Sequence, residues 1–249
     1  MKSILDNFSR LAIVIVVCGA PFCLAQNTNM YFNGGFQGNV VCGLPDGCAG
    51  TGFYDGSINN VNVGPGQASP GFVCDDYLDN VTTGETWKAN GINVASLNSS
   101  NISQTLFGSS PNLSASAALT LYAEMAYLMN QMFTTNPTAA QQASYSEALW
   151  YLSANAVQPG KIKLNTLDSQ AQTDVTNAEL NANTPLSQYG NLWIYTPSPM
   201  GPGEAQEMWS TVAVSEGGSA AMYLLLAALS CCGAMLFRAR SRRPRHLAA

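Results

Sequence analysis

Histidine and basic residues are scarce in this chain of 249 residues. The one histidine, His246, lies close to the C-terminus. Between Gln26 and Ser215 thirteen acidic residues face only three basic ones, a net charge of −10; the three are Lys88, Lys161 and Lys163. This region therefore cannot build a Ser-His-Asp or Cys-His catalytic group, and it lacks the basic stripe that phosphate binding needs. We exclude these enzyme classes, and we expect no nucleic-acid partner.

The N-terminal 25 residues have the layout of a secretory signal peptide. Lys2 and Arg10 accompany an apolar run from Leu11 to Ala20, and Cys23-Leu24-Ala25 places small residues at the −3 and −1 positions before Gln26. A membrane-spanning helix needs about 20 apolar residues, and this run is half that length. We expect the secretory translocon to export the chain and signal peptidase to cut it after Ala25.

The C-terminal segment, residues 214–249, has the layout of a membrane anchor. Ala220 to Phe237 carries no charge over eighteen residues, which is just long enough to span a bilayer. A cluster of five arginines follows it and predicts a cytoplasmic end, so the preceding domain faces outward. The cluster consists of Arg238, Arg240, Arg242, Arg243 and Arg245.

The region between the two ends is predicted to form a secreted α+β domain. Residues 26–70 are rich in glycine, asparagine and aromatic residues, and we expect a loop-rich region there with short strands at 30–32 and 39–41. Residues 71–213 begin with strands at 72–76 and 86–94 and end with strands at 192–195 and 208–212. Helices lie between these strands, an order that favours α+β over a parallel βαβ fold.

Apolar residues at steps of three and four predict two helices and suggest a third. The first covers 116–133, with Ser114 or Ser116 as its N-cap. The second follows Pro137, covers 138–154 and ends before Pro159-Gly160. Residues 167–182 are polar and only weakly periodic, so we expect a third, mostly exposed helix there.

Two small motifs offer candidate cross-links or ligands. Cys42 and Cys48 flank a turn that contains Pro45 and Gly47, a spacing that favours a local disulfide in an oxidising compartment over a zinc site. Asp75, Asp76 and Asp79 form the densest acidic cluster. Close carboxylates suit calcium, but the spacing of an EF-hand loop is missing, and a strand-end turn with solvated acids explains the same residues better.

The C-terminal segment resembles the PEP-CTERM sorting signals of Gram-negative bacteria that make exopolysaccharide. Val214-Ser215-Glu216-Gly217-Gly218 precedes the apolar span, which contains Met222-Tyr223-Leu224-Leu225-Leu226-Ala227. This is similar to the variant reading Pro-Glu-Gly-Gly, with Ser215 where the family usually has proline. The resemblance implies processing by an exosortase, a membrane cysteine peptidase, and release to the cell surface or the exterior. A plain uncut anchor is the alternative.

Residues 72–211 resemble the order of motifs in secreted PEP-CTERM proteins of the acidobacterial type and, more distantly, the thioester domains of Gram-positive surface adhesins. The motifs are Phe72–Asp76, Gly84–Trp87, Ala148–Leu152 and Ile194–Pro197. In thioester domains a cysteine condenses with a glutamine two residues before an Ala-Ile-Trp motif. Cys74 matches that cysteine, but Ser146 occupies the glutamine position, and a serine hydroxyl cannot supply the acyl group.

These features together predict a non-enzymatic protein of the cell surface or extracellular matrix. We expect it to be anchored in the inner membrane before an exosortase processes it, to bind a glycan, such as an exopolysaccharide, or a surface protein, and to need no cofactor. One alternative is a covalent thioester adhesin that uses Cys74. Another is a secreted hydrolase that pairs Asp75 or Asp76 with Glu124 or Glu147.

Overall fold

The computed structural model describes residues 26–67, 69–201 and 204–213. The predicted signal peptide, the sorting motif at 214–218, the apolar segment 220–237 and the arginine cluster lie outside these residues. Within the described part, none of the helices has the length and apolar character needed to cross a membrane.

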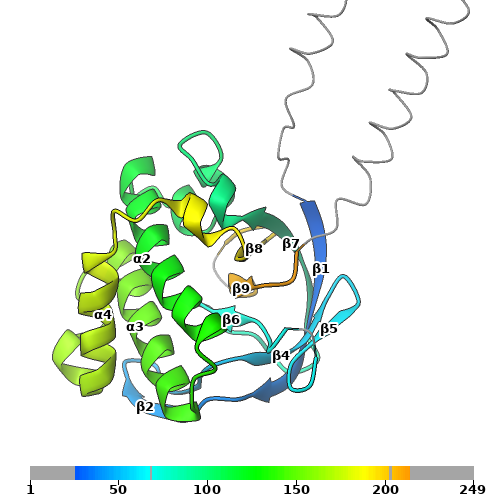
Figure 1. Ribbon diagram of the computed structural model, residues 1–249, viewed down its shortest axis with the longest axis horizontal. Helices are drawn as coiled ribbons and strands as arrows, with labels where there is room; N and C mark the ends of the chain where they lie inside the picture. The colour runs from blue at the N-terminus through cyan, green and yellow to red at the C-terminus, as the bar shows by residue number, and fades with distance from the viewer. Residues whose placement is uncertain (1–25, 68, 202–203, 214–249) are drawn as a thin grey trace, which may run out of the picture. The chain divides into compact units, whose positions relative to one another are not determined.

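The described residues form one antiparallel sheet of seven strands and a separate two-stranded hairpin. Along the sheet the strands follow the order β5 (Val61–Val63), β4 (Tyr54–Ile58), β1 (Gln26–Phe36), β7 (Thr86–Asn93), β8 (Trp193–Pro197), β9 (Met208–Ser210) and β6 (Val73–Cys74). Phe72, directly before β6, pairs back with Tyr54 of β4 through backbone hydrogen bonds of 2.7 and 3.1 Å. The sheet is therefore curled, and its β6 side returns to β4 (Figure 1).

Residues 26–70 belong to this sheet and are more regular than the sequence predicts. Strand β1 extends over eleven residues and pairs on both sides: Met30 lies opposite Ile58 of β4 and opposite Trp87 of β7. The expected strand at 30–32 is thus the middle of a long strand, while β4 and β5 are strands that we did not predict. The expected division at residue 70 has no counterpart in the sheet.

The small hairpin consists of β2 (Val40–Leu44) and β3 (Gly47–Gly50). The predicted disulfide between Cys42 and Cys48 is confirmed, and it joins the two strands across the turn. Lys161 forms a salt bridge of 3.0 Å with Asp46 at the tip of the hairpin. A covalent bond therefore closes the hairpin, and the salt bridge links its tip to the segment around Lys161.

Three α-helices lie side by side next to the sheet in the described part of the chain (Figure 1). They are α2 (Ala115–Thr134), α3 (Ala139–Val157) and α4 (Ser169–Leu180). The Ser114 hydroxyl accepts the Ala117 N–H at 3.1 Å, which confirms the predicted N-cap of α2. Short 3-10 helices connect the larger elements: η1 (Val94–Ser96), η2 (Ile102–Gln104), η3 (Phe107–Ser109), η4 (Leu164–Thr166) and η5 (Leu186–Tyr189).

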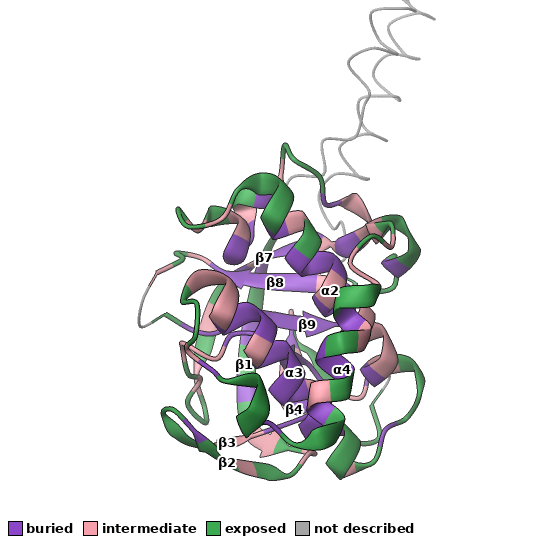
Figure 2. Ribbon diagram, turned by 90° about the vertical axis from the view of Figure 1, so that its left-hand side faces the viewer, coloured by how far each residue is buried: buried purple, intermediate pink, exposed green. Residues whose placement is uncertain are grey.

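The core lies between these helices and the sheet. Strands β8 and β9 are almost entirely buried, and exposed residues lie on the outer sides of the helices (Figure 2). Helix α4 is less exposed than we expected, because Ala171, Val175 and Ala178 are buried on one face against the other helices. The order of strands, helices and strands confirms the α+β class.

Candidate functional site

Cys74, Asp75 and Asp76 lie at the end of β6, deep in the molecule. All three are buried, with exposed fractions of 2% or less, so the acids are not the solvated strand-end turn that we favoured from the sequence. The antiparallel register pairs Cys74 with Met208 of β9. Glu207, the residue before β9, is therefore brought next to Asp75 from 132 positions further along the chain.

The Cys74 thiol is a buried group that the structure keeps in its protonated form. Its sulfur donates to the carbonyl oxygen of Asp76 at 3.0 Å. Burial and the neighbouring charges of Asp76 and Asp75 raise the pKa of the thiol, although the indole N–H of Trp150 lies close enough to oppose this weakly. Because the thiolate is the reactive form, this environment makes Cys74 a poor nucleophile.

We expect alkylation to confirm that Cys74 is unreactive in the folded protein. Iodoacetamide at pH 8 should label Cys74 at least about a hundredfold more slowly in the native protein than in the protein unfolded in guanidinium, because the native thiol is both buried and protonated. Peptide mapping by mass spectrometry measures both rates at this residue. Rapid native labelling would contradict the described environment.

Ser146, which occupies the glutamine position of thioester domains, and the nearby Gln141 and Gln142 hold other parts of the fold. The Ser146 hydroxyl accepts the Gly52 N–H at 3.0 Å, and the Gln142 carboxamide accepts the Phe53 N–H at 3.3 Å. Gly52 has a φ of +83°, and a Cβ there would lie 2.2 Å from the Gln142 oxygen. The Gln141 side chain accepts the Thr138 N–H in the capping box of α3. Each of these groups therefore has a structural partner.

Asp75 and Glu207 form a buried pair of carboxyl groups. Glu207 accepts hydrogen bonds from the Tyr122 hydroxyl at 2.6 Å, from the Leu106 N–H at 2.9 Å and from the Thr196 hydroxyl. Asp75 accepts the Trp209 indole N–H at 2.5 Å through one oxygen, and its other oxygen accepts none. The pair thus joins β6, β8, β9, α2 and the 3-10 segment before α2.

The two carboxyl groups lie close enough for each to change the pKa of the other. Burial, followed by the charge of Glu207, raises the pKa of Asp75 well above its usual range. Burial also raises the pKa of Glu207, but hydrogen bonds from Thr196 and Tyr122 oppose this. We infer that Asp75 carries the proton and donates it to an ionised Glu207, because two adjacent buried carboxylates cannot both ionise at low cost.

The calcium prediction for Asp75, Asp76 and Asp79 gains no support from the geometry. Asp75 faces Trp209 and Glu207, whereas Asp76 accepts the Leu78 N–H at 2.9 Å and also interacts with Asp79. Burial raises the pKa of Asp76 to about 7. Among residues 26–67, 69–201 and 204–213, no three His, Cys, Asp or Glu side chains are arranged to hold a metal ion.

Glu124 and Glu147, which a hydrolase would pair with Asp75 or Asp76, interact with other groups. Glu147 accepts the Asp168 N–H at 3.1 Å and so joins α3 to the start of α4. Glu124 lies opposite Glu179, and burial together with that negative charge raises its pKa to about 7. Neither residue is among the main causes of the raised pKa values of Asp75 and Asp76.

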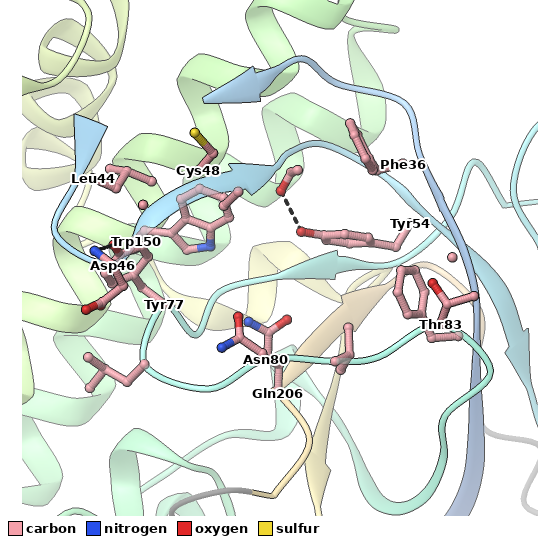
Figure 3. A pocket seen from close by; sticks show the side chains of 17 residues that line it. Phe36, Leu44, Asp46, Cys48, Tyr54, Tyr77, Asn80, Thr83, Trp150 and Gln206 are labelled. Atoms are coloured by element: carbon pink, nitrogen blue, oxygen red, sulfur yellow. Dashed lines mark hydrogen bonds between the residues drawn. The ribbon is translucent and has the colours of Figure 1, made fainter. Parts of the chain in front are cut away.

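A cleft of about 390 Å³ lies between the β2–β3 hairpin and residues 77–83 (Figure 3). Carboxamides, a hydroxyl and a carboxylate face the same space from Asn80, Gln206, Thr83 and Asp46. Five aromatic side chains line it: Phe32, Phe36, Tyr54, Tyr77 and Trp150. A concave site with aromatic lining and a few converging polar groups is typical of ligand binding.

The structure fixes two of these aromatic rings with hydrogen bonds. The Tyr54 hydroxyl donates to the carbonyl of Gly50 at 2.7 Å, and the Tyr77 hydroxyl accepts the Asp46 N–H at 2.9 Å. Tyr77 also packs against Trp150, with 5.8 Å between ring centroids. These contacts therefore hold the hairpin, β4 and residues 77–83 together around the cleft without the help of a ligand.

Most of these residues carry no recognisable signal in the sequence. Tyr54, Tyr77 and Gln206 sit in segments with no recognisable motif, and Glu207 is a single acid in front of a short strand. Trp150 was noted only as part of the Ala-Leu-Trp motif of α3. A search for isolated acids directly next to apolar strand residues, such as Glu207 before Met208-Trp209, could have marked the buried pair.

The predicted sorting residues at 214–218 and the arginine cluster lie outside the described residues, so the structure does not bear on them. The resemblance to PEP-CTERM proteins and to thioester domains therefore remains a prediction from the motifs quoted above. Comparison of the chain with protein-family models, with curated proteins and with solved structures finds no match.

Proposed function

We propose that this protein is a non-enzymatic, exported binding protein whose ligand, a glycan or a protein segment, occupies the cleft beside the disulfide-closed hairpin. The observation that carries the proposal is the convergence of aromatic rings, two of them fixed by hydrogen bonds, and polar side chains on one concave surface. The strongly perturbed acids and the thiol are committed instead to the core, where they hold strands and helices together.

The export route belongs to the same proposal. A disulfide persists in oxidising compartments, which fits secretion through the translocon and cleavage by signal peptidase. We propose that an exosortase then cuts near Val214–Gly218 and transfers the domain to the cell surface or the extracellular matrix. The C-terminal mass of the mature protein tests this, because a chain that keeps its arginine cluster would contradict cleavage.

Binding is tested with insoluble extracellular matrix prepared from the producing cells. The purified protein should be retained on this matrix, and Phe36→Ala should reduce retention, because Phe36 lines the cleft and is 41% exposed. Val61→Ala is the matched control, since Val61 is an exposed apolar residue on β5, outside the cleft. If both variants lost retention equally, or if neither variant lost any, binding in the cleft would be contradicted.

We also expect the hairpin disulfide to matter for binding. Replacing both Cys42 and Cys48 by serine should lower the free energy of unfolding by about 2 kcal/mol, the loop-closure value for such a short loop. Retention on matrix should fall as well, because one side of the cleft loses its cross-link. Retention that is unchanged in this variant would show that the hairpin does not shape the site.

The covalent alternative makes a distinct prediction for intact mass. A Cys74 thioester would remove one ammonia, about 17 Da, and would leave no free thiol. We expect the full mass and one free Cys74, because Ser146 and Gln142 are held by Gly52 and Phe53.

A further inference from the structure

The cleft has two unlike sides, which we name by their residues. The aromatic side consists of Phe36, Tyr54 and Tyr77, and the polar side consists of Asn80, Thr83 and Gln206. Figure 3 shows the carboxamides of Asn80 and Gln206 next to each other, with the Tyr54 ring above them and Tyr77 toward one end. A ligand in this space would therefore meet flat apolar rings and hydrogen-bonding groups at the same time.

The accessible apolar area of the aromatic side comes mostly from Phe36, which is 41% exposed, and from the half-buried Tyr77, while Tyr54 is 9% exposed. Tyr54 and Tyr77 are fixed by their hydrogen bonds to the hairpin, and the Phe32 ring packs edge-on against Tyr54 with 5.5 Å between centroids. Rings that are already ordered lose little freedom when a ligand covers them. Such rings favour a ligand with a flat apolar face.

The polar side offers acceptors and donors that the fold leaves for a ligand. Both N–H groups of the Gln206 carboxamide are used, because they donate to the carbonyls of Asp76, at 2.7 Å, and Asp79. Its oxygen is then available as an acceptor in the cleft. Asn80 and Thr83 are exposed and add both donors and acceptors. This side favours a ligand that carries several hydroxyl groups.

The charge of the surroundings argues against an anionic ligand. The region from Gln26 to Ser215 carries a net charge of −10, and Asp46, the carboxylate at the cleft, is already paired with Lys161. A polyanion would be repelled by this field. A quaternary ammonium ion would be attracted to the rings, but it has no donors or acceptors to satisfy the carboxamides.

We infer that the cleft binds an uncharged oligosaccharide, such as a segment of a neutral exopolysaccharide. The apolar faces of its pyranose rings lie on the aromatic side, and its hydroxyl groups bond with Asn80, Thr83 and the Gln206 oxygen. This inference rests on the proposed function, because it names the ligand class of the same cleft. The volume of about 390 Å³ is within the range of about 300–1,000 Å³ that is usual for small-molecule sites.

Isothermal titration calorimetry of the purified protein with a fixed set of probes tests the inference. The set contains neutral hexasaccharides of β-1,4-glucose, β-1,3-glucose and mannose, a hexamer of galacturonic acid, choline, and an unstructured neutral peptide. We expect at least one neutral hexasaccharide to bind, and Phe36→Ala and Asn80→Ala each to weaken that binding about tenfold. Val61→Ala, on β5, should leave it unchanged.

The outcomes separate the ligand class from the site. If galacturonate, choline or the peptide binds instead and the cleft variants abolish that binding, the site stands and the neutral-saccharide inference fails. If a neutral hexasaccharide binds equally well to both cleft variants, the saccharide class stands and the proposed site in the cleft fails. If no probe binds, the saccharide inference is overturned, while retention on matrix still decides the proposed function.

Discussion

Raising the pH from about 4 to 8 is expected to lower the free energy of unfolding of this protein, the reverse of ordinary acid denaturation. Burial raises the pKa of Asp76 to about 7 and raises that of Asp75 well above its usual range. In the unfolded chain both groups titrate near pH 4. Between these values the folded state binds more protons than the unfolded state, so its stability falls as the pH rises.

The size of this effect follows from the shift of Asp76. A rise from 3.8 to about 7 corresponds to about 4 kcal/mol at about 1.4 kcal/mol per unit, fully present below pH 4 and lost as the pH passes through 7. In a domain of this size such a change moves Tm by about 10 °C. The described residues contain one salt bridge, Lys161–Asp46, so little stability should be lost in acid.

Calorimetric unfolding at pH 4.5, 6 and 8 measures this dependence. In Asp75→Asn the side chain cannot ionise but can still donate to Glu207, so its curve should be flatter and its Tm at pH 8 higher than that of the wild type. Glu204→Gln, which changes an exposed carboxylate, should keep the wild-type slope. A wild-type Tm that rises steadily from pH 4.5 to 8 would show that Asp75 and Asp76 are ionised in the fold.

Glu207→Ala is expected to be the most destabilising single substitution in the buried carboxyl pair. It leaves the Tyr122 and Thr196 hydroxyls and the Leu106 N–H without their acceptor. Each unpaired buried donor costs about 1–3 kcal/mol, so we expect a loss of about 4 kcal/mol or more in the free energy of unfolding. Chemical denaturation in urea at pH 6 measures it.

Two further variants keep this expectation testable if Glu207→Ala does not fold. Tyr122→Phe removes one hydrogen bond to Glu207 and should cost about 1–2 kcal/mol, while Glu204→Ala, three residues before Glu207 and exposed, should change stability by less than about 0.5 kcal/mol. Equal small effects of Tyr122→Phe and Glu204→Ala would mean that the Glu207 hydrogen bonds add nothing to stability.

The helices were the part of the fold that the sequence predicted best. The steps of three and four residues in α2 and α3, together with Ser114 and Pro137, are local signals, and they placed both helices within three residues of their observed ends. Strand β4 gave no such signal, because Tyr54-Asp55-Gly56-Ser57-Ile58 lacks a run of β-branched residues. Its place is decided by pairing with β1, a contact between distant segments that a local pattern does not contain.

For the buried acidic cluster, the sequence predicted only the residues that are neighbours along the chain. The sequence marked Cys74, Asp75 and Asp76 as unusual, but their meaning depends on Glu207, which the Cys74–Met208 register brings beside them. Without that register, exposed acids and a calcium site were both reasonable interpretations. The disulfide was predictable because its cysteines are six positions apart and flank a turn-forming sequence. The cleft was not, because it gathers side chains from the hairpin, β4, α3 and residues 77–83.

An NMR titration tests most directly whether the ligand occupies this cleft rather than another surface. Amide spectra of the isotope-labelled protein would be recorded while the neutral hexasaccharide that binds in calorimetry is added. We predict that the shifted amide signals belong to residues 44–50 and 77–83 and to Gln206, with little change in α4. A second groove is lined by residues of α2, α3 and α4, among them Glu124, Tyr151 and Glu179. Shifts centred on that groove, with residues 77–83 unaffected, would contradict binding in the cleft.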